Sequence, residues 1–202
     1  MKLVILDRDG TINEDRDDFV KSPAEWVPIP GALEAIARLN HAGWHTVIAT
    51  NQSGLARGLL DMATLNAIHA RMNRELAELG GRIDAVFFCP HGPDDGCTCR
   101  KPLPGLFTTI GERYGVALNE TYAVGDSLRD LQAGVAAGCA AHLVRTGKGA
   151  RLDAPALSAL VEAAPDAVVH DDLAAFAQQL IQRERAQRGG SDEADSAFSK
   201  LT

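Results

Sequence analysis

The apolar positions along the chain fall into two alternating patterns. Residues 3–6 form a continuous apolar run, Leu-Val-Ile-Leu, which is typical of a strand buried on both faces of a sheet. In residues 31–42 the apolar side chains instead recur three and four positions apart, as on one face of a helix. The first pattern predicts strands at residues 2–6, 46–50, 83–88, 121–124, 141–144 and 167–170. The second predicts helices at residues 31–42, 61–79, 105–114, 127–137 and 172–185.

This alternation predicts the fold class. Strands separated by helices of this length form mostly parallel sheets with helices on both faces, so we expect an α/β protein. A chain of 202 residues is long enough to bury a core as one domain, which we place at residues 1–186. Residues 187–202 are rich in Gly, Ser, Asp, Glu and Lys, and we expect this tail to be disordered.

Composition and charge narrow the class of protein. With 46% hydrophobic and 23% charged residues, the chain has the make-up of an ordinary globular protein. No apolar run approaches the roughly 18 residues of a membrane span, and no secretory signal follows Lys2, so we expect a cytoplasmic protein without a membrane partner. A formal net charge of −7 argues against nucleic-acid binding. It is compatible with an anionic small substrate in a cleft that holds cations.

Two acidic residues directly follow the first predicted strand. Asp7 and Asp9 flank Arg8, and Gly10 comes next. One carboxylate can attack a phosphoryl group as a nucleophile while the other transfers a proton. Asp-x-Asp-Gly is also a common turn sequence, so this spacing alone leaves both interpretations open.

Polar residues follow the later predicted strands as well. The carboxyl ends of parallel strands meet at one edge of a sheet, where ligands bind, so we expect these side chains to lie close together. The candidates are Thr50, Asn51, Gln52, Ser53 and Arg57 after the second strand, Arg100 and Lys101 after the third, and Asp126 and Asp130 after the fourth.

These residue types suit one kind of chemistry. Hydroxyl and N–H groups near Thr50 can hold phosphate oxygens, and Lys101 can supply a point charge to a phosphoryl group. Asp126 and Asp7 offer the oxygen ligands that Mg²⁺ prefers, with Asp130 as a further ligand or as a partner of one. Taken singly, each segment is also explained as a polar loop, a surface basic pair or a helix cap. Together they favour magnesium-dependent phosphoryl transfer.

A cluster of cysteines predicts a second metal site. The spacing Cys-x-His-x₅-Cys-x-Cys offers three thiolates and one imidazole, which match a closed tetrahedral zinc site, with free buried thiols as the alternative. The predicted ligands are Cys89, His91, Cys97 and Cys99. Because Arg100 and Lys101 follow the last ligand directly, zinc would fix the loop that presents them. Cys139 lies outside this set and is expected in the core. The other histidines show no partner pattern and are interpreted as structural or surface residues: His41, His45, His69, His142 and His170.

In this order the segments resemble the haloacid dehalogenase-like (HAD) phosphatase superfamily. The motifs that carry the resemblance are Asp7-x-Asp9, Thr50, Lys101 and Gly125-Asp126-x₃-Asp130. Within the superfamily, residues 6–13, residues 50–58 and the Cys/His loop that ends at Pro102 resemble the phosphatases of heptose 1,7-bisphosphate. The resemblance covers roughly residues 3–146 and implies a Rossmann-like three-layer sandwich without a large cap domain.

The resemblance also implies roles for the candidate residues. Asp7 would be the nucleophile and Asp9 the acid/base, while Thr50 and Lys101 would stabilise the phosphoryl group. Mg²⁺ would be held by Asp7, the Asp9 carbonyl and Asp126. The substrate contacts would come from Asn51, Gln52, Ser53, Arg57 and Arg100. The expected reaction removes the C7 phosphate through an aspartyl-phosphate, and the resulting heptose 1-phosphate would feed heptose nucleotides for lipopolysaccharide or other surface glycans.

Two other functions stay open at this point. Histidinol-phosphate phosphatases belong to the same superfamily and can carry a similar zinc loop. A zinc- and phosphate-binding module without turnover is the alternative from another class. Two departures from the resemblance concern substrate contacts and the preferred anomer at C1: residues 15–19 are more charged than in some members, and Ser127 stands where some carry Lys. A small sugar phosphate is the expected binding partner, and we expect a monomer.

Overall fold

A single parallel sheet forms the centre of the protein. The computed structural model describes residues 1–198, and the side chains of residues 157, 161 and 188–198 lie outside this description. Six strands lie in the order β3-β2-β1-β4-β5-β6, and each neighbouring pair is parallel. Their bounds are β1 Leu3–Leu6, β2 His45–Asn51, β3 Ala85–Cys89, β4 Tyr122–Gly125, β5 Ala140–Val144 and β6 Val168–His170. The predicted α/β class and its strands are confirmed.

Helices connect the strands. The α-helices are α1 Ala32–His41, α2 Met62–Glu78, α3 Gly105–Tyr114, α4 Leu128–Ala136, α5 Ala154–Ala163 and α6 Leu173–Phe198. Short 3-10 turns lie at Pro23–Glu25, Leu118–Glu120 and Gly149–Arg151. Asp61 is the N-cap residue of α2, and its side chain accepts a hydrogen bond from the Thr64 N–H at 2.8 Å. Helix α5 was not predicted from the sequence.

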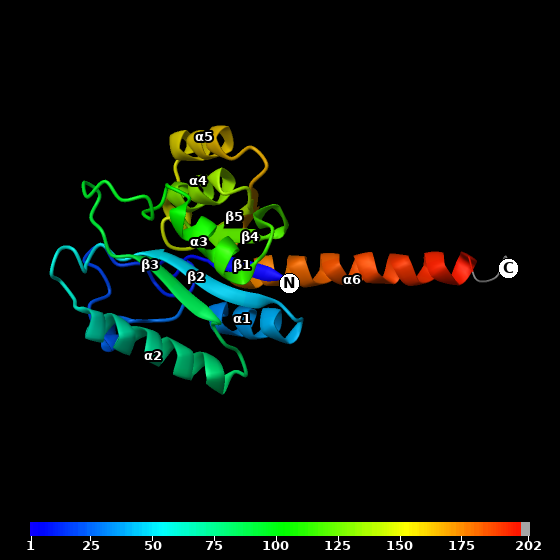
Figure 1. The fold of residues 1–202 in the computed structure, drawn as a ribbon, viewed down its shortest axis with the longest axis horizontal. Helices are drawn as coiled ribbons and strands as arrows, with labels where there is room; N and C mark the ends of the chain where they lie inside the picture. Colours follow the sequence, from blue (N-terminus) through cyan, green and yellow to red (C-terminus); the bar gives the residue numbers. More distant parts are fainter. Residues whose placement is uncertain (199–202) are drawn as a thin grey trace.

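The helices cover both faces of the sheet and make three layers (Figure 1). Side chains of α1, α2 and α6 pack in one hydrophobic cluster with Val4 and Leu6 of β1. Side chains of α3 and α4 pack on the other face in a cluster with Leu3 and Ile5, and α5 lies beside α4 on that same face. Neighbouring residues of β1 thus point into opposite cores, which explains why a buried parallel strand is apolar at every position.

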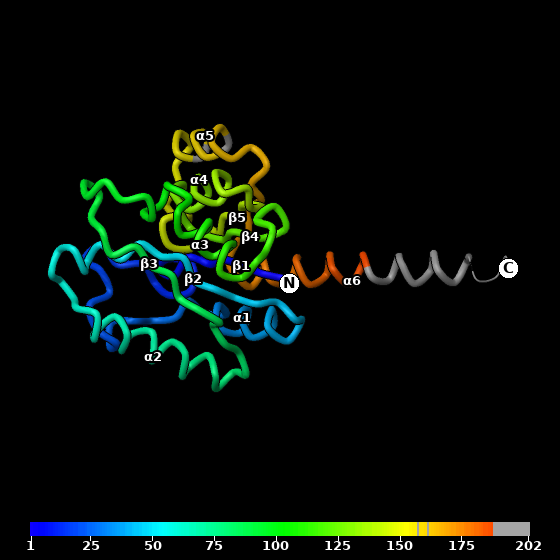
Figure 2. The backbone as a smooth tube through the Cα atoms, in the orientation of Figure 1, coloured from blue at the N-terminus to red at the C-terminus, as the bar shows by residue number. Residues whose placement is uncertain are grey.

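The path of the chain creates the place for a site. As the tube in Figure 2 shows, the chain starts at β1, adds β2 and β3 on one side, and then crosses back to place β4 on the other side of β1. Open α/β sheets bind ligands where the strand order reverses in this way, beyond the carboxyl ends of the strands. Here that point lies between the loops after β1 and β4. The start of the loop after β1 is joined to β4 by a hydrogen bond of 2.8 Å from the Asp7 N–H to the Val124 carbonyl.

The connecting loops carry no additional domain. Within the described chain, residues 7–31 contain one 3-10 turn and isolated bridges, and residues 90–104 contain no helix or strand. This agrees with the expected absence of a large cap domain. Among the described helices, none has an apolar stretch that would cross a membrane.

The C-terminal helix is longer than expected. The sequence pattern predicts an end near Arg185, whereas α6 is described as far as Phe198. The predicted disordered tail, residues 187–202, falls on the last part of this helix and on residues 199–202, which lie outside the described residues. The domain boundary at residue 186 therefore stays a prediction.

Candidate active site

A cavity of about 350 Å³ opens at the carboxyl edge of the sheet. Loops that follow β1, β2, β3, β4 and β5 all contribute to its lining. The sequence-predicted residues for phosphoryl transfer and substrate binding line this one cavity: Asp7, Asp9, Thr50, Asn51, Gln52, Ser53, Arg57, Arg100, Lys101, Asp126 and Asp130. The rule that strand ends meet at one edge thus brings together residues more than a hundred positions apart. Their individual roles stay predictions.

Lys101 forms the centre of the site. Its ammonium lies 2.8 Å from Asp7 Oδ1 and 2.5 Å from Asp130 Oδ1, and it donates to the Ala49 carbonyl at 2.8 Å. The residue is only 2% exposed, so these three partners replace its water. Burial lowers the pKa of Lys101, but the charges of Asp130 and Asp7 outweigh burial and raise it above its ordinary value. The lysine is therefore a fixed cation beside the predicted nucleophile.

Three carboxylates form a candidate magnesium site. One oxygen each of Asp7, Asp126 and Asp130 lies within 4.8 Å of the others. Burial, and after it the charges of Asp130 and Asp7, raise the pKa of Asp126 to about 8. The pKa of Asp7 is raised to about 6, chiefly by burial, although the charge of Lys101 lowers it. This crowding of acidic oxygens fits a hard divalent cation, which would allow all three groups to ionise together.

The start of helix α4 separates the roles of Asp130, in its first turn, and Asp126, which precedes its N-cap. Ser127 is the N-cap residue, and Asp130 accepts hydrogen bonds from the Ser127 N–H at 3.0 Å and from its hydroxyl at 2.5 Å. This is a capping box, which occupies one oxygen of Asp130 while Lys101 occupies the other. Asp126 does not cap the helix; its Oδ2 atom accepts from the Lys148 N–H at 2.6 Å. Asp126 is thus the better placed of the two to bind a cation.

Close packing around Asp126 explains the glycine of the Asp-x-Asp-Gly motif. Gly10 has a φ angle of 86°, in the left-handed region. A Cβ atom at this position would lie 2.1 Å from Asp126 Oδ2. A side chain here would displace the carboxylate, so the first and fourth strand ends can meet only because residue 10 is glycine.

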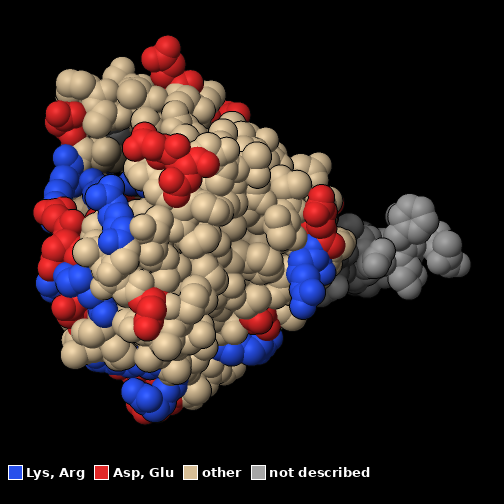
Figure 3. All heavy atoms as spheres, turned by 60° about the vertical axis from the view of Figure 1, so that its left-hand side comes forward, with Lys and Arg blue, Asp and Glu red and all other residues tan. Residues whose placement is uncertain are grey.

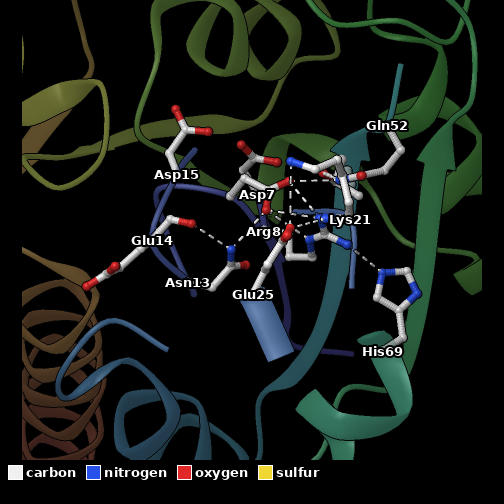
Figure 4. A network of polar contacts seen from close by, with 12 residues as sticks. Asp7, Arg8, Asn13, Glu14, Asp15, Lys21, Glu25, Gln52 and His69 are labelled. Carbon is white, nitrogen blue, oxygen red and sulfur yellow. Dashed lines mark hydrogen bonds and ion pairs between the residues drawn. The ribbon is translucent and has the colours of Figure 1, made fainter. Parts of the chain in front are cut away.

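Asp9 is held by the side chains of Arg8, Asn13 and Gln52, which are labelled in Figure 4. Arg8 donates to both of its oxygens, Asn13 donates to Oδ1 at 2.9 Å, and Gln52 donates to Oδ2 at 2.8 Å. Burial raises the pKa of Asp9, but the charge of Arg8 and these hydrogen bonds outweigh burial and lower it below its ordinary value. Asp9 is therefore ionised and fixed in orientation in the free protein.

The last residues of β2 connect the site to the loop after β3. Thr50 is 1% exposed, and its hydroxyl accepts a hydrogen bond from Gln52 at 3.0 Å. The Asn51 amide donates to the Lys101 carbonyl at 3.0 Å and accepts from the Lys101 N–H at 3.1 Å. These paired bonds hold the backbone of Lys101 against β2. Arg57 lies further along the cavity, with its guanidinium 5.7 Å from the ring centre of Phe19.

The predicted zinc ligands come together in space. One ligand atom each of Cys89, His91, Cys97 and Cys99 lies within 4.8 Å of the others. The Cys89 and Cys97 sulfurs are 3.6 Å apart, and the His91 Nδ1 atom lies 3.6 Å from the Cys89 sulfur and 3.3 Å from the Cys99 sulfur. Tetrahedral zinc with ordinary bond lengths requires separations of about 3.5–3.8 Å. The two separations of 3.6 Å lie in this range and the third, 3.3 Å, is slightly shorter, so the donor set is close to the arrangement that the ion needs. Cys139 lies in the core, as expected.

Several residues of the site were missed from the sequence. Arg8 was regarded only as the spacer between two aspartates, yet it is fully buried and bonded to Asp9. Lys148 lines the cavity, pairs with Asp15, and contacts Asp126 through its backbone. A signal for Lys148 was present, because it follows the fifth strand and the strand-end rule applies there too. Arg129 also lines the cavity.

Charges of both signs surround the cavity. Its lining includes Asp15, Arg16 and Asp17 from the loop after β1, opposite Lys148 from the loop after β5. Figure 3 shows basic and acidic side chains side by side along one margin of the face it draws. Cations are therefore available for an anionic substrate even though the whole chain has a net charge of −7.

Comparison with known proteins identifies the family. A family model described as "HAD-hyrolase-like" matches residues 98–176. The chain is 61% identical to the D-glycero-beta-D-manno-heptose-1,7-bisphosphate 7-phosphatase of Bordetella bronchiseptica, over 90% of this chain and 99% of that protein. It is 52% identical to the protein of the same name from Pseudomonas aeruginosa, over 89% of this chain and 98% of that one.

Solved structures give the same result. A crystal structure of D,D-heptose 1,7-bisphosphate phosphatase from B. bronchiseptica, complexed with magnesium and phosphate, superposes with a TM-score of 0.86 at 60% identity, over 91% of this chain and 99% of that chain. The corresponding enzyme from Burkholderia thailandensis gives a TM-score of 0.69 at 50% identity, over 90% and 99% of the two chains. The resemblance predicted from the motifs is therefore confirmed. The chain belongs to the D-glycero-beta-D-manno-heptose-1,7-bisphosphate 7-phosphatases of the HAD superfamily.

Proposed function

We propose that this protein hydrolyses the C7 phosphate of D-glycero-β-D-manno-heptose 1,7-bisphosphate and releases heptose 1-phosphate and inorganic phosphate. The observation that carries the proposal is the Asp7–Lys101–Asp130 cluster beside Asp126. It lies in a cavity at the edge of the sheet where the strand order reverses. Relatives at 61% and 52% identity carry this activity in their names and specify the β anomer. The product would feed the synthesis of heptose nucleotides for surface glycans.

The reaction takes two steps at Asp7. In the first, a carboxylate oxygen of Asp7 attacks phosphorus, the bond from phosphorus to the C7 oxygen breaks, and Asp9 gives its proton to that oxygen. In the second, Asp9 takes a proton from a water molecule, whose oxygen attacks phosphorus and frees Asp7. The phosphate bound beside Asp9 raises its pKa again, because a like charge disfavours the ionised carboxylate. Asp9 can therefore carry a proton in the first step.

The developing negative charge is met by groups already in place. Lys101 holds its ammonium 2.8 Å from Asp7 Oδ1, where the phosphoryl group arrives. Thr50 offers a buried hydroxyl on the neighbouring strand. Preorganised donors of this kind stabilise a transition state without reorganisation, and losing one typically costs on the order of 10²-fold in rate. This is the role that we assign to Lys101 and Thr50.

Magnesium is the cofactor that the site supports. Asp7, Asp126 and the carbonyl of Asp9 would hold it, because the crowded carboxylates need a cation in order to ionise together. When bound, it would neutralise phosphate charge and align the group for in-line displacement. The B. bronchiseptica enzyme was crystallised with magnesium and phosphate, which supports this proposal.

Zinc would have a structural role. The Cys89, His91, Cys97 and Cys99 cluster fits a closed tetrahedral site without an open position for substrate. Arg100 donates to the His91 carbonyl at 3.1 Å, which links its guanidinium to the zinc loop. We propose that zinc fixes this loop and so presents Arg100 and Lys101 to the cavity.

The rest of the cavity would recognise the sugar and its second phosphate. Arg100 and Arg57 line the cavity with Asn51, Gln52 and Ser53, and arginine forks suit a phosphate or a sugar diol. The expectations of a monomer and of a cytoplasmic location stay predictions.

The proposal is tested by the substrate preference of the purified protein loaded with Mg²⁺ and Zn²⁺. Phosphate release would be measured with both anomers of heptose 1,7-bisphosphate, with histidinol phosphate and with 4-nitrophenyl phosphate. We expect kcat/KM to be highest for the β anomer, by roughly 10²-fold over histidinol phosphate, since substrate binding and transition-state contacts both favour it. Equal or faster turnover of histidinol phosphate would be compatible with the proposed reaction steps at Asp7 but would overturn the assignment of heptose 1,7-bisphosphate as the substrate.

A further inference from the structure

Arg8 is a buried cation next to the predicted acid/base. Its residue exposure is 0%, and it is not among the residues that line the cavity. Burying a guanidinium is costly unless its N–H groups find partners. Arg8 meets this need with two side chains: Asp9, through three contacts of 2.9–3.2 Å, and His69, whose Nε2 atom lies 3.1 Å from Nη1.

The contact with His69 fixes the state of the imidazole. A guanidinium has donors and no acceptor, so Arg8 donates in this contact and His69 Nε2 accepts. His69 is therefore neutral, with its proton on Nδ1. Burial, and after it the charge of Arg8, lower the pKa of His69 to about 4, in agreement with this assignment. The histidine is a permanent acceptor, and Figure 4 shows it facing the guanidinium from helix α2.

His69 is itself anchored in the core. It is 9% exposed on α2, and its neighbours Ile68 and Met72 pack in the hydrophobic cluster on that face of the sheet. A rigid helix thus holds the imidazole, and the imidazole holds the guanidinium. The far end of this chain of contacts is the carboxylate of Asp9, whose two oxygens are both occupied.

We propose that His69 and Arg8 are positioning residues for Asp9: His69 fixes the guanidinium of Arg8, and Arg8 fixes the carboxylate that transfers the proton. This inference rests on the proposed function, because it needs Asp9 as acid/base. Neither residue is among those that line the cavity. Their effect is confined to the orientation of Asp9, and this distinguishes them from residues that hold the fold together.

The two steps of the reaction respond differently to a misplaced Asp9. A sugar alkoxide is a poor leaving group and needs the proton of Asp9 to depart. 4-Nitrophenolate leaves without a proton, so formation of the phosphoenzyme from 4-nitrophenyl phosphate does not need Asp9. Loss of positioning should therefore slow sugar phosphate hydrolysis and spare the first release of nitrophenolate.

The test compares His69→Asn with His69→Gln in the full-length protein loaded with Mg²⁺ and Zn²⁺. The oxygen of glutamine can accept from Arg8 at the place of Nε2, whereas asparagine is one methylene too short. We expect His69→Asn to lower kcat on heptose 1,7-bisphosphate by about tenfold or more, with KM changed by less than about threefold. In rapid mixing with 4-nitrophenyl phosphate, its first-turnover rate should stay within about threefold of the unmodified protein. His69→Gln should recover most of the lost kcat.

His142→Asn is the matched control, because His142 has the same 9% exposure and bonds to His170 away from the cavity. This variant should change neither kcat on heptose 1,7-bisphosphate nor the first-turnover rate with 4-nitrophenyl phosphate. The inference is overturned if His69→Asn and His69→Gln behave alike, or if both substrates lose first-turnover rate in parallel. Failure of the proposed function would look different, because the unmodified protein would then lack turnover of heptose 1,7-bisphosphate.

Discussion

The ammonium of Lys101 lies 2.8 Å from the Oδ1 atom of Asp7, beyond the carboxyl ends of the neighbouring strands β1 and β4. This pairing keeps a positive charge against the carboxylate that we assign as nucleophile, and Asp130 holds the ammonium from the other side at 2.5 Å. The contact joins the first and third loops of the sheet edge. It is also the place where a phosphoryl group would collect negative charge.

Replacing Lys101 should reduce the rate more than substrate binding. We expect Lys101→Ala to lower kcat by about 10²-fold or more, as losing one preorganised charge at a transition state typically does. Steady-state phosphate release measures this effect. Lys21→Ala is a suitable control, because Lys21 pairs with Asp18 outside the cavity lining. Near-normal rates in Lys101→Ala would remove Lys101 from the mechanism.

Replacing Asp7 or Asp9, the two aspartates of the loop after β1, should block different steps of the reaction. Asp7→Asn removes the nucleophile, so neither product release nor a burst of nitrophenolate from 4-nitrophenyl phosphate should occur. Asp9→Asn keeps the nucleophile, so a burst should remain while turnover is nearly abolished. Rapid-mixing absorbance separates these outcomes, and circular dichroism checks the fold. A burst in Asp7→Asn would assign the nucleophile to another residue.

Stability should depend on pH through Asp126. Its pKa is raised from 3.8 to about 8, chiefly by burial and then by the charges of Asp130 and Asp7. Between these values the folded protein binds this proton and the unfolded chain does not, so the contribution of Asp126 to stability is present below 3.8 and is lost as the pH rises through about 8. We therefore expect the magnesium-free protein to lose stability relative to Asp126→Asn as the pH rises from about 4 to about 8.

Magnesium should reverse this loss, because it binds the ionised carboxylates. Thermal unfolding of the zinc-loaded protein with and without Mg²⁺ measures the effect. The rise in Tm should be larger at about pH 8.5 than at pH 6 and should be small in Asp126→Asn. The proposed site would be contradicted by an equal Mg²⁺ effect in both proteins at both pH values.

Loss of zinc should abolish activity and leave the sheet intact. Cys99→Ser removes one ligand of the cluster, and the loop that carries Arg100 and Lys101 should then lose its fixed position. Metal content, phosphate release and circular dichroism measure the three parts of this prediction. Cys139→Ser, a change of a buried thiol outside the cluster, is the control. Full activity in a verified zinc-free protein would reject the structural role of zinc.

Arg100 should act on substrate recognition. Its guanidinium bonds to the His91 carbonyl and lines the cavity, and Asp7 and Lys101 are placed without it. We expect Arg100→Ala to raise KM for heptose 1,7-bisphosphate by about tenfold with a smaller change in kcat. KM for 4-nitrophenyl phosphate, which lacks the second phosphate, should change less. Equal effects on both substrates would place Arg100 at the reacting phosphate.

Much of the fold is readable from the sequence because its strands are buried on both faces. Residues 3–6 form an uninterrupted apolar run, and the observed strands differ from the predicted ones by only a few residues. Helix α5 escaped prediction for the opposite reason. Its sequence, APALSALVEA, is apolar on nearly every side, so it lacks the polar face that reveals helical periodicity.

The candidate site was readable as a set of residues but not as a set of contacts. The strand-end rule places Asp7, Thr50, Lys101 and Asp126 together without any knowledge of side-chain direction. The bond between Arg8 and His69 joins positions 61 residues apart on a strand end and a helix, and neither residue type marks the other in the sequence. The contact of the Lys148 N–H with Asp126 is a backbone interaction, which residue identity does not reveal.

The central claim is that the cavity removes the C7 phosphate and leaves the phosphate at C1. The most direct measurement follows the protein, loaded with Mg²⁺ and Zn²⁺, acting on D-glycero-β-D-manno-heptose 1,7-bisphosphate by ³¹P NMR. The account predicts that the C7 phosphate signal is replaced by inorganic phosphate while the C1 signal persists, and that Asp7→Asn shows no change. Loss of the C1 signal first, or no hydrolysis in the presence of Mg²⁺, would contradict it.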